Sequence, residues 1–316
     1  MPLGYSLKTS FSSCVSACPT TSEVELFRCL KMAFSSMPDY SAGEIHGHKR
    51  QVLYTEANGW FTKKPRCELG DLAIIAFSKK KGQGRLVIIQ NKVSRDSKRG
   101  LGSNCRGIYA SLVQYELLRE RPFFCFASGP YSGRRNGLIK FSPYSSVCQY
   151  GLFYKDRFGN VDMSSITASE FALPAKTILR FPIRSRHPVA KIEFNKKFET
   201  FASRSATGDF VAAENLIDFG NLLEDMYIGR PINVYQKKVI EDMLMLKMAS
   251  DDADMSYEAR RAIDDFMGTE FIEDTNVSYL NGENENNKAE WDCLLNVCRS
   301  LVLINVDPCR LNETFD

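Results

Sequence analysis

The sequence predicts a mixed α/β (α+β) fold in which helices flank a central mixed β-sheet. Two short aliphatic runs, residues 72–77 (LAIIAF) and 85–90 (RLVIIQ), are joined by the polar segment KKKGQG, which is the pattern of a β-hairpin. Both runs are apolar on either face, so we expect the sheet to be covered on both sides. Segments with helical spacing of apolar residues precede and follow the hairpin, and these predict the covering layers.

The elements around the hairpin are predicted in order along the chain. Residues 22–37 place apolar side chains at helical spacing behind a Ser or Thr cap, which predicts a helix. Residues 51–56 predict a strand before the hairpin. After the hairpin, residues 104–120 predict a helix that stops before Pro122, and residues 123–127 predict another strand. Helix, three strands, helix and strand is therefore the expected order of the core.

The remainder of the chain predicts a second region. We expect a domain over residues 1–200 and an acidic, mainly helical region over residues 201–316. Within this second region, residues 208–248 show helical spacing in at least two segments, and residues 251–292 predict a short acidic helix followed by a polar loop. The apolar run at residues 300–305 predicts a final buried strand.

Charge changes sign between the same two regions. Residues 1–200 carry 31 Lys and Arg against 15 Asp and Glu, whereas residues 201–316 carry 10 against 23. A basic field suits a polyanion, because each neutralised phosphate releases counterions. One hypothesis is that the C-terminal carboxylates shield the basic surface until a partner or a nucleic acid displaces them. The alternative is a separately solvated helical module.

Three polar residues are expected to meet at one end of the hairpin. Asp71 opens the first strand, and Gln90 and Lys92 close its antiparallel neighbour. Residues two apart in a strand share a face, so Gln90 and Lys92 point together while Asn91 faces away. A carboxylate and a second oxygen ligand can hold Mg²⁺ or Mn²⁺, and an ammonium group can position the attacking water and offset phosphate charge. The cluster predicts phosphodiester hydrolysis, with Asp71 and Gln90 as metal ligands and Lys92 as the positioned cation.

This arrangement resembles the signature of the PD-(D/E)XK nuclease superfamily, whose fold is called restriction-endonuclease-like. In that family an Asp opens the second core strand, and Glu-x-Lys or Gln-x-Lys closes the third. Asp71 and Lys92 match these positions, and Gln90 matches a variant found in bacterial defence nucleases. Leu69 and Gly70 stand where the signature has its Pro, which many members lack. The order of predicted elements agrees with the family core over roughly the first 140 residues.

The resemblance implies a biochemical activity and partners. It implies a restriction-endonuclease-like core and a Mg²⁺-dependent (or Mn²⁺-dependent) DNA endonuclease. It also implies an effector of bacterial anti-phage defence, with a protein partner that supplies sensing or activation. Many members add an acid from the first helix to the metal site, and Glu25 is the candidate, with Glu23 beside it. Both glutamates also suit the first turn of a helix, where carboxylates complement the helix dipole.

Basic residues near the motif are expected to contact nucleic acid. Lys63, Lys64 and Arg66 precede the motif, and a Gly-rich loop downstream adds an arginine pair beside Tyr131. Arginine and an aromatic ring can bind a phosphate and stack on a base, although a plain surface loop is the alternative. The predicted nucleic-acid-binding residues are Lys79, Lys80, Lys81, Arg95, Lys98, Arg99, Arg134 and Arg135.

Other functions remain open on the sequence. A catalytically inactive nucleic-acid-binding or assembly subunit would keep the fold, and the neutral Gln90 favours it because a neutral ligand weakens metal binding. An RNA-directed nuclease would use the same site. Nucleases that cut both strands often act as dimers, so a homo-oligomer is a further expectation.

Composition sets the remaining expectations. The ten cysteines lack a Cys-x-x-Cys pair, so we interpret most as buried reduced thiols, with structural zinc at residues such as Cys14 and Cys18 as the minor alternative. No apolar run reaches 18 residues, so we expect no transmembrane helix and no membrane partner. The N-terminal segment lacks the apolar core of a secretory signal, and we expect a cytoplasmic protein.

Overall fold

The computed structural model describes most of the predicted core. The described residues are 1–18, 22–37, 40–44, 51–55, 61, 63–94, 107–127, 135–136, 145–173, 189–194, 212–234, 236–237, 240–241, 257–271 and 298–307. They form the helices α1 (Leu3–Ala17), α2 (Glu23–Ser35), α3 (Leu112–Glu120), α5 (Leu216–Glu224) and α7 (Tyr257–Met267), with 3₁₀ turns η1 (Ser145–Val147) and η2 (Ala168–Glu170). In the described part of the chain, no helix is long and apolar enough to cross a membrane.

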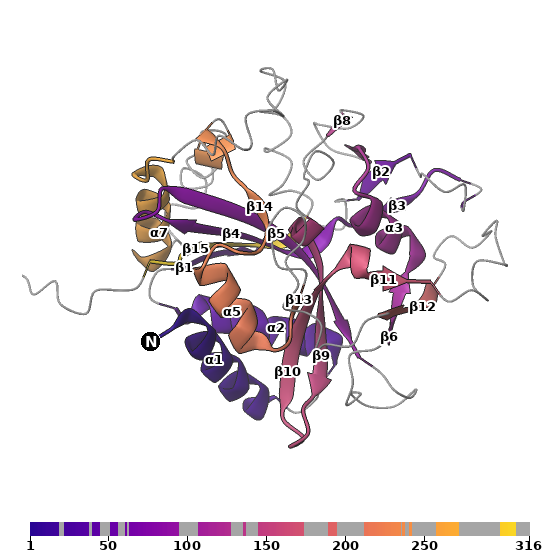
Figure 1. The fold of residues 1–316 in the computed structure, drawn as a ribbon, viewed down its shortest axis with the longest axis horizontal. Coiled ribbons are helices and arrows are strands. Elements are labelled where there is room, and N and C mark those ends of the chain that lie inside the picture. The colour runs from indigo at the N-terminus through magenta and orange to yellow at the C-terminus, as the bar shows by residue number, and fades with distance from the viewer. Residues whose placement is uncertain are drawn as a thin grey trace, which may run out of the picture.

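A central mixed sheet organises the molecule (Figure 1). Its strand order is β1-β15-β4-β5-β9-β10-β13, and β14 pairs with β5 beside this path. Strands β4 and β5 are antiparallel, whereas β15 runs parallel to β4 and β9 runs parallel to β5. The predicted α/β class and mixed central sheet are therefore confirmed. The strands are β1 (Tyr40–Glu44), β4 (Gly70–Ser78), β5 (Gln83–Val93), β9 (Cys148–Lys155), β10 (Val161–Thr167), β13 (Ala212–Ala213), β14 (Arg230–Pro231) and β15 (Cys298–Asn305).

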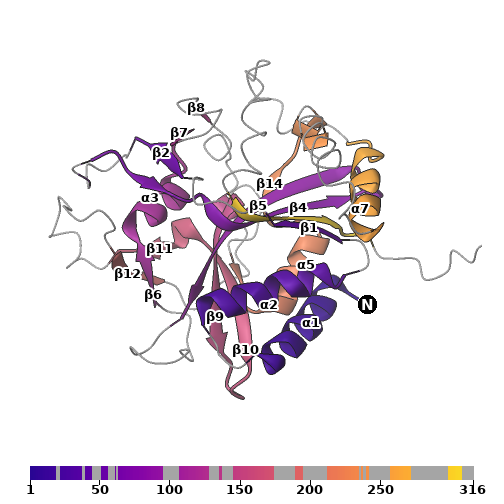
Figure 2. The ribbon, with the colours of Figure 1, turned by 180° about the vertical axis from the view of Figure 1, so that it is seen from behind.

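Both faces of the β4–β5 hairpin are buried, as its two-sided apolar pattern predicts. One face packs against α1, α2 and α5, in a core that includes Phe34, Phe153 and Phe219. The opposite face packs against α3 and α7, in a core that includes Tyr115 and Phe266. Figure 2 shows α1 and α2 lying side by side on their face of the sheet.

Two smaller sheets lie at the periphery. One has the order β3-β2-β7-β8 and the other the order β11-β12-β6. The predicted strands at 51–56 and 123–127 form β2 and β7, which pair with each other in the first of these sheets and not in the central sheet. The bounds are β2 (Val52–Tyr54), β3 (Arg66–Cys67), β6 (Gly107–Ser111), β7 (Phe124–Phe126), β8 (Arg135–Asn136), β11 (Phe171–Ala172) and β12 (Val189–Phe194).

The element after the hairpin also differs from its predicted bounds. The helix expected over 104–120 begins at Leu112, because residues 107–111 form β6, which pairs with the distant β12. Downstream of α3, the central sheet continues with β9, parallel to β5. Between β5 and β9 the chain forms α3 together with strands of the two smaller sheets. Because β5 and β9 are parallel neighbours, this connection is a crossover that includes a helix.

The acidic C-terminal region takes part in the same sheet. Strand β15 lies between β1 and β4, and β13 and β14 pair with β10 and β5. Helix α5 packs on α1, where a Cβ placed on Gly220 would lie 2.4 Å from the Cα of Gly4. The described parts of residues 201–316 contain strands as well as helices. The domain boundary at residue 200 stays a sequence prediction. Strands that follow this boundary are hydrogen-bonded to strands that precede it.

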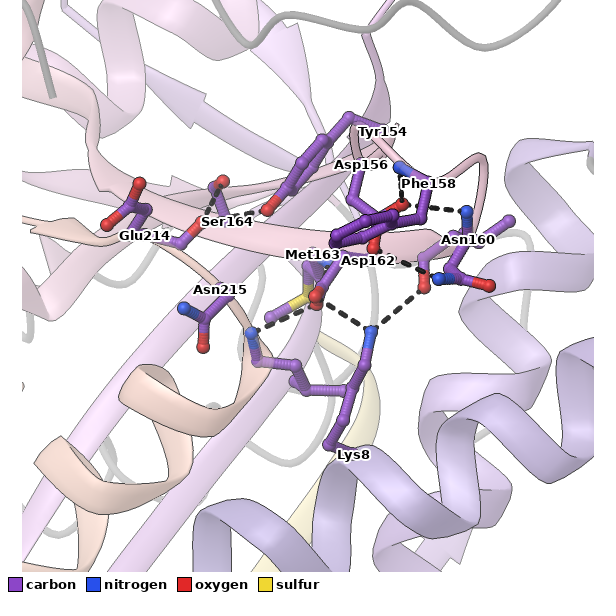
Figure 3. A network of polar contacts seen from close by, with 12 residues as sticks. Lys8, Tyr154, Asp156, Phe158, Asn160, Asp162, Met163, Ser164, Glu214 and Asn215 are labelled. Carbon is purple, nitrogen blue, oxygen red and sulfur yellow. Dashed lines mark hydrogen bonds and ion pairs between the residues drawn. The ribbon is translucent and has the colours of Figure 1, made fainter.

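One buried ion pair connects α1, β10 and α5 (Figure 3). Lys8 Nζ lies 2.7 Å from Asp162 Oδ2 and donates a hydrogen bond to the carbonyl of Val161. The other carboxylate oxygen of Asp162 accepts the backbone N–H groups of Met163 and Leu216, the latter being the first residue of α5. A single carboxylate therefore stabilises the junction of three elements.

Candidate active site

Asp71 and Gln90 meet at the end of the β4–β5 hairpin that lies away from its turn. The antiparallel register pairs Leu72 with Ile89, which places Asp71 opposite Gln90. Asp71 Oδ2 accepts a 2.6 Å hydrogen bond from Gln90 Nε2 and a 2.9 Å bond from the backbone N–H of Asn91. Asp71 Oδ1 makes no hydrogen bond to any residue that the structure describes. The carboxylate is thus held by one oxygen while the other remains available.

Lys92 completes the site together with a glutamate from α2. Its Nζ donates a 2.7 Å hydrogen bond to Glu23 Oε1. The side chain of Lys92 is 16% exposed and that of Glu23 is 39% exposed, whereas Asp71 is 9% exposed and Gln90 4%. The cluster is buried at Asp71 and Gln90 and opens to solvent on the side of Glu23.

Of the two first-helix acids, Glu23 contacts Lys92, whereas Glu25, the predicted metal ligand, pairs with Ser22. Glu25 forms a capping box with Ser22, whose Oγ accepts the backbone N–H of Glu25 at 3.3 Å and donates to its carboxylate at 2.8 Å. This pairing satisfies a free N–H group of the first helical turn. Glu25 therefore serves the helix end, and Glu23 points its carboxylate at Lys92.

Helix α3 adds a residue that the sequence analysis did not identify. Gln114 Nε2 donates to Gln90 Oε1 and, at 3.2 Å, to the backbone carbonyl of Glu68. The amide of Gln90 is consequently fixed at both ends, with its nitrogen toward Asp71 and its oxygen toward Gln114. In the sequence, the one indication of this role is that Gln114 is a polar residue between the apolar Val113 and Tyr115 of the predicted helix. In the structure Gln114 is buried. Glu68 itself, whose carbonyl accepts a bond from Gln114, has an exposed side chain.

Burial dominates the electrostatics of Asp71. It raises the pKa of Asp71 to about 6, and Glu23 and Glu68 add smaller upward effects through charge repulsion. Lys92 and the backbone N–H of Asn91 act in the opposite direction, because both stabilise the ionised carboxylate. Asp71 is therefore ionised less readily than an ordinary aspartate.

The basic hairpin turn lies far from this site. Asp71 and Lys79 are eight positions apart along an extended strand, a distance of about 25 Å. Lys79 contacts Asp265 of α7 at 3.5 Å, and Lys81 Nζ donates to the carbonyl of Glu224. Figure 1 shows α7 beside this turn, with α3 and β3 beyond the other end of the two strands. The turn residues Lys79, Lys80 and Lys81 are thus not brought together with the site.

Other predicted nucleic-acid contacts have different outcomes. Exposed Lys63, Lys64 and Arg66 precede β4 by a few residues, so they belong to the chain leading into the strand end that carries Asp71. Four further predicted contacts lie outside the described residues: Arg95, Lys98, Arg99 and Arg134. For Arg135 the structure describes the backbone but not the side chain.

The donor set suits a hard divalent cation held by few protein ligands. Mg²⁺ commonly binds through one or two carboxylates and keeps several waters. Asp71 Oδ1 and the carboxylate of Glu23 are the available anionic oxygens, and the Gln90 oxygen would face Asp71 after rotation of its amide. Among the described residues, three or more His, Cys, Asp or Glu ligand atoms come within 4.8 Å of one another only at Cys14, Cys18 and Cys29. Two carboxylates are therefore the most that this site offers from these residues.

Comparisons with known proteins complete the description of the site. A scan against protein-family models, a search of curated proteins and a search of solved structures each found no match for this chain. Asp71, Gln90, Lys92 and Glu23 are accordingly interpreted from their own geometry and chemistry.

Proposed function

We propose that this protein is a metal-dependent endonuclease that hydrolyses DNA phosphodiester bonds at Asp71, Gln90, Lys92 and Glu23. The observation that supports this most is the convergence of these side chains from two strand ends and one helix start. Gln90 and Asp71 are 2.6 Å apart at their nearest polar atoms, and Lys92 and Glu23 are 2.7 Å apart. An ammonium group next to carboxylates and an amide is a set that can support metal-dependent phosphodiester hydrolysis.

Asp71 and Glu23 have the role of metal ligands in this proposal. A bound Mg²⁺ or Mn²⁺ supplies positive charge that stabilises the phosphate oxygens during cleavage. The backbone N–H of Asn91 holds one oxygen of Asp71 and so orients the other outward. Gln114 fixes the amide of Gln90, which in turn positions Asp71. The buried part of the site is thereby preorganised, which lowers the cost of ordering it around a substrate.

Lys92 has the role of the positioned cation. Its ammonium group lies at the boundary between the buried Asp71 and the more exposed Glu23. From there it orients an attacking water and offsets the charge that builds on the phosphate. Exposed basic side chains that precede β4 guide the nucleic acid backbone toward the site; these are Lys63, Lys64 and Arg66.

The resemblance to the PD-(D/E)XK superfamily supports the biological part of the proposal. The Gln-x-Lys variant, Gln90 to Lys92, resembles that of bacterial defence nucleases. We infer that the chain is an effector of anti-phage defence in the cytoplasm and that a partner protein supplies sensing or activation. The β4–β5 hairpin, with Asp71 and Gln90 together at its open end and helix α3 after it, supports a restriction-endonuclease-like core.

A second candidate is a catalytically inactive nucleic-acid-binding or assembly subunit. The orientation of Gln90 favours it, since the amide nitrogen and not the oxygen faces Asp71. An amide that donates to the carboxylate stabilises its charge without a metal. In this alternative the basic surface binds nucleic acid while the site is structural.

Plasmid cleavage separates the two candidates. Supercoiled plasmid is incubated with Mg²⁺ or Mn²⁺ and wild-type protein, Asp71→Ala, Lys92→Ala or the control Lys79→Ala, which changes the distant turn. Cleavage is expected to fall at least about 100-fold in the two site variants, with DNA binding retained, and to persist in the control. Binding without cleavage by wild type under either metal, with its native partner present, would favour the inactive subunit. The same assay with RNA in place of the plasmid decides whether DNA or RNA is the substrate.

A further inference from the structure

Three cysteine sulfurs converge where α1 packs on α2, and none of them belongs to the site proposed above. Cys14 Sγ lies 2.8 Å from Cys29 Sγ, and Cys18 Sγ lies 3.3 Å from Cys29 Sγ. All three sulfurs lie within 4.8 Å of one another. Cys14 and Cys18 are one helical turn apart on α1, and Cys29 faces them from α2. Two neighbouring helices therefore present three thiols to one point.

We propose that Cys14, Cys18 and Cys29 form a binding site for a soft d¹⁰ metal cation, Zn²⁺ or Cu⁺. Thiolates are the preferred ligands of both ions. The thioether of Met32, whose sulfur lies 3.8 Å from Cys14 Sγ, adds a further soft donor on the exposed side of the cluster. The hard cation proposed for Asp71 would not compete for this sulfur-only set.

The gathering of three sulfurs fits one shared metal, whereas a single disulfide would use only two of them. A disulfide requires about 2.05 Å between two sulfurs and leaves the third cysteine unpaired. Sulfurs bound to one tetrahedral zinc lie about 3.8 Å apart, given zinc–sulfur bonds of about 2.3 Å. The observed separations of 2.8 and 3.3 Å lie between these values, and all three sulfurs share the site. Shifts of about 1 Å or less would admit the ion.

Access and position also suit a metal site. Cys29 is buried, whereas Cys14 and Cys18 are half-buried, so an ion can enter from solvent on their side. Cys18 is the C-cap of α1, and Cys29 is in the middle of α2. The metal would connect the end of one helix to the body of the next. It would thereby stabilise the helix whose first residue is Glu23.

Metal titration of the full-length chain, kept reduced, tests the site. Zn²⁺ and Cu⁺ are tested in separate arms by competition with a chromophoric chelator, and Co²⁺ serves as a spectroscopic substitute for zinc. We expect one equivalent per chain, a sulfur-to-cobalt charge-transfer band, a higher Tm with metal, and no effect of excess Mg²⁺. Cys14→Ser and Cys18→Ser should weaken binding by more than the roughly 10–100-fold loss typical of residues that only support a ligand.

Matched controls make each outcome decisive. Cys125→Ser changes a half-buried cysteine of β7 outside the cluster and should bind metal as wild type does. Wild-type protein that binds neither ion stoichiometrically would overturn the proposal, as would binding that both α1 variants retain. A mass loss of two hydrogens on exposure to air, without metal uptake by the reduced chain, would assign the cluster to disulfide chemistry instead. The cobalt spectrum of the wild-type protein tests the site even if a variant fails to fold.

Discussion

Glu23 and Glu25 are both in the first turn of α2 but contact different partners. Glu23 pairs with Lys92, whereas Glu25 pairs with Ser22 in the capping box. We expect Glu23→Ala to lower plasmid cleavage by at least roughly 10–100-fold, because the site loses one of its two proposed carboxylate ligands and Lys92 loses its partner. Glu25→Ala should leave cleavage close to wild type and lower the free energy of unfolding by only about 0.3–1 kcal/mol, because the Ser22 cap on the backbone N–H of residue 25 remains and only a first-turn carboxylate is lost.

Cleavage rates and urea unfolding of the two variants measure this contrast. Both substitutions remove one carboxylate from the same turn, so helix-dipole effects are matched. Equal losses of cleavage in both variants would show that α2 matters only as a folded helix.

The raised pKa of Asp71 predicts a pH dependence of stability without divalent cations. Burial raises its pKa from an ordinary 3.8 to about 6 in the folded protein, so the folded state holds more protons between these pH values. The free energy of unfolding should therefore fall as pH rises through this range, by about 3 kcal/mol from this residue. Asp71→Asn cannot titrate and should lack this loss.

The measurement is the stability difference between Asp71→Asn and wild type from pH 4 to pH 7 in chelator. It should grow with pH in favour of the variant. Added Mg²⁺ should reduce the difference, because a cation stabilises the ionised carboxylate of wild type. A difference that does not change with pH would show that Asp71 is not destabilised by burial.

Residue identities at the site were only partly predictable. Strand alternation was enough to group Gln90 with Lys92, because the period of two is fixed by the backbone. The choice between Glu23 and Glu25 depended on which one Ser22 caps, and a first turn with two acids leaves that open. Gln114 contacts Gln90 across 24 residues, and local patterns carry no information on such a contact.

At the scale of elements, the junction of α1, β10 and α5 should be sensitive to one carboxylate. Asp162→Ala would leave Lys8 and the N–H groups of Met163 and Leu216 without their shared partner. We expect a loss of about 3–5 kcal/mol in the free energy of unfolding, as for other buried ion pairs broken on one side. Urea denaturation measures this loss.

Lys79→Ala is the matched control for a surface pair. Lys79 is 55% exposed and lies 3.5 Å from Asp265, so its loss should change stability by less than about 1 kcal/mol. Comparable effects of Asp162→Ala and Lys79→Ala would contradict a stabilising role for the buried pair.

Elements were predicted well where the local pattern is strong. The β4–β5 hairpin and α2 follow their sequence spacing closely, because apolar periodicity and a capping residue define them. Strand β6 was predicted as the start of a helix, since its partner β12 lies about 80 residues away in sequence. Helix α1 was not predicted, because its stripe contains few large apolar residues, chiefly Leu7 and Phe11. Tertiary contacts decided both cases.

At the scale of the whole molecule, the positions of the basic residues predict where nucleic acid binds. The double variant Lys63→Glu with Lys64→Glu should weaken DNA binding and reduce the slope of log affinity against log salt by about 2, one unit for each lost phosphate contact. Lys79→Glu with Lys80→Glu changes the same charge at the distant turn and should have a small effect. Binding isotherms at several salt concentrations measure both slopes.

The opposite ranking of these two double variants would place the nucleic acid at the hairpin turn. In that case Asp265 and Asp307 would be the acids that oppose binding, because they contact Lys79 and the backbone of Lys80. The C-terminal shielding hypothesis would then apply to the turn and not to the site of Asp71.

Removal of the C-terminal strand should abolish folding. Deletion of residues 298–316 removes β15, which separates β1 from β4 inside the central sheet. We expect loss of the cooperative thermal transition, because β4 loses its parallel strand partner and the core loses the side chains of Val302 and Ile304. A truncated chain with an unchanged transition would show that β15 is dispensable. Shielding by acidic residues is therefore better tested with Asp265→Asn than with truncation.

The place of β15 in the sheet has a consequence for protein synthesis. Strand β1 is at the sheet edge and pairs with β15, so residues 40–44 have no strand partner in this sheet until residues 298–305 leave the ribosome. At typical bacterial or eukaryotic elongation rates this interval is about 10–50 s. During translation the nascent chain would expose an unpaired edge of β4, and chaperones that bind such edges would reach it before the sheet is complete.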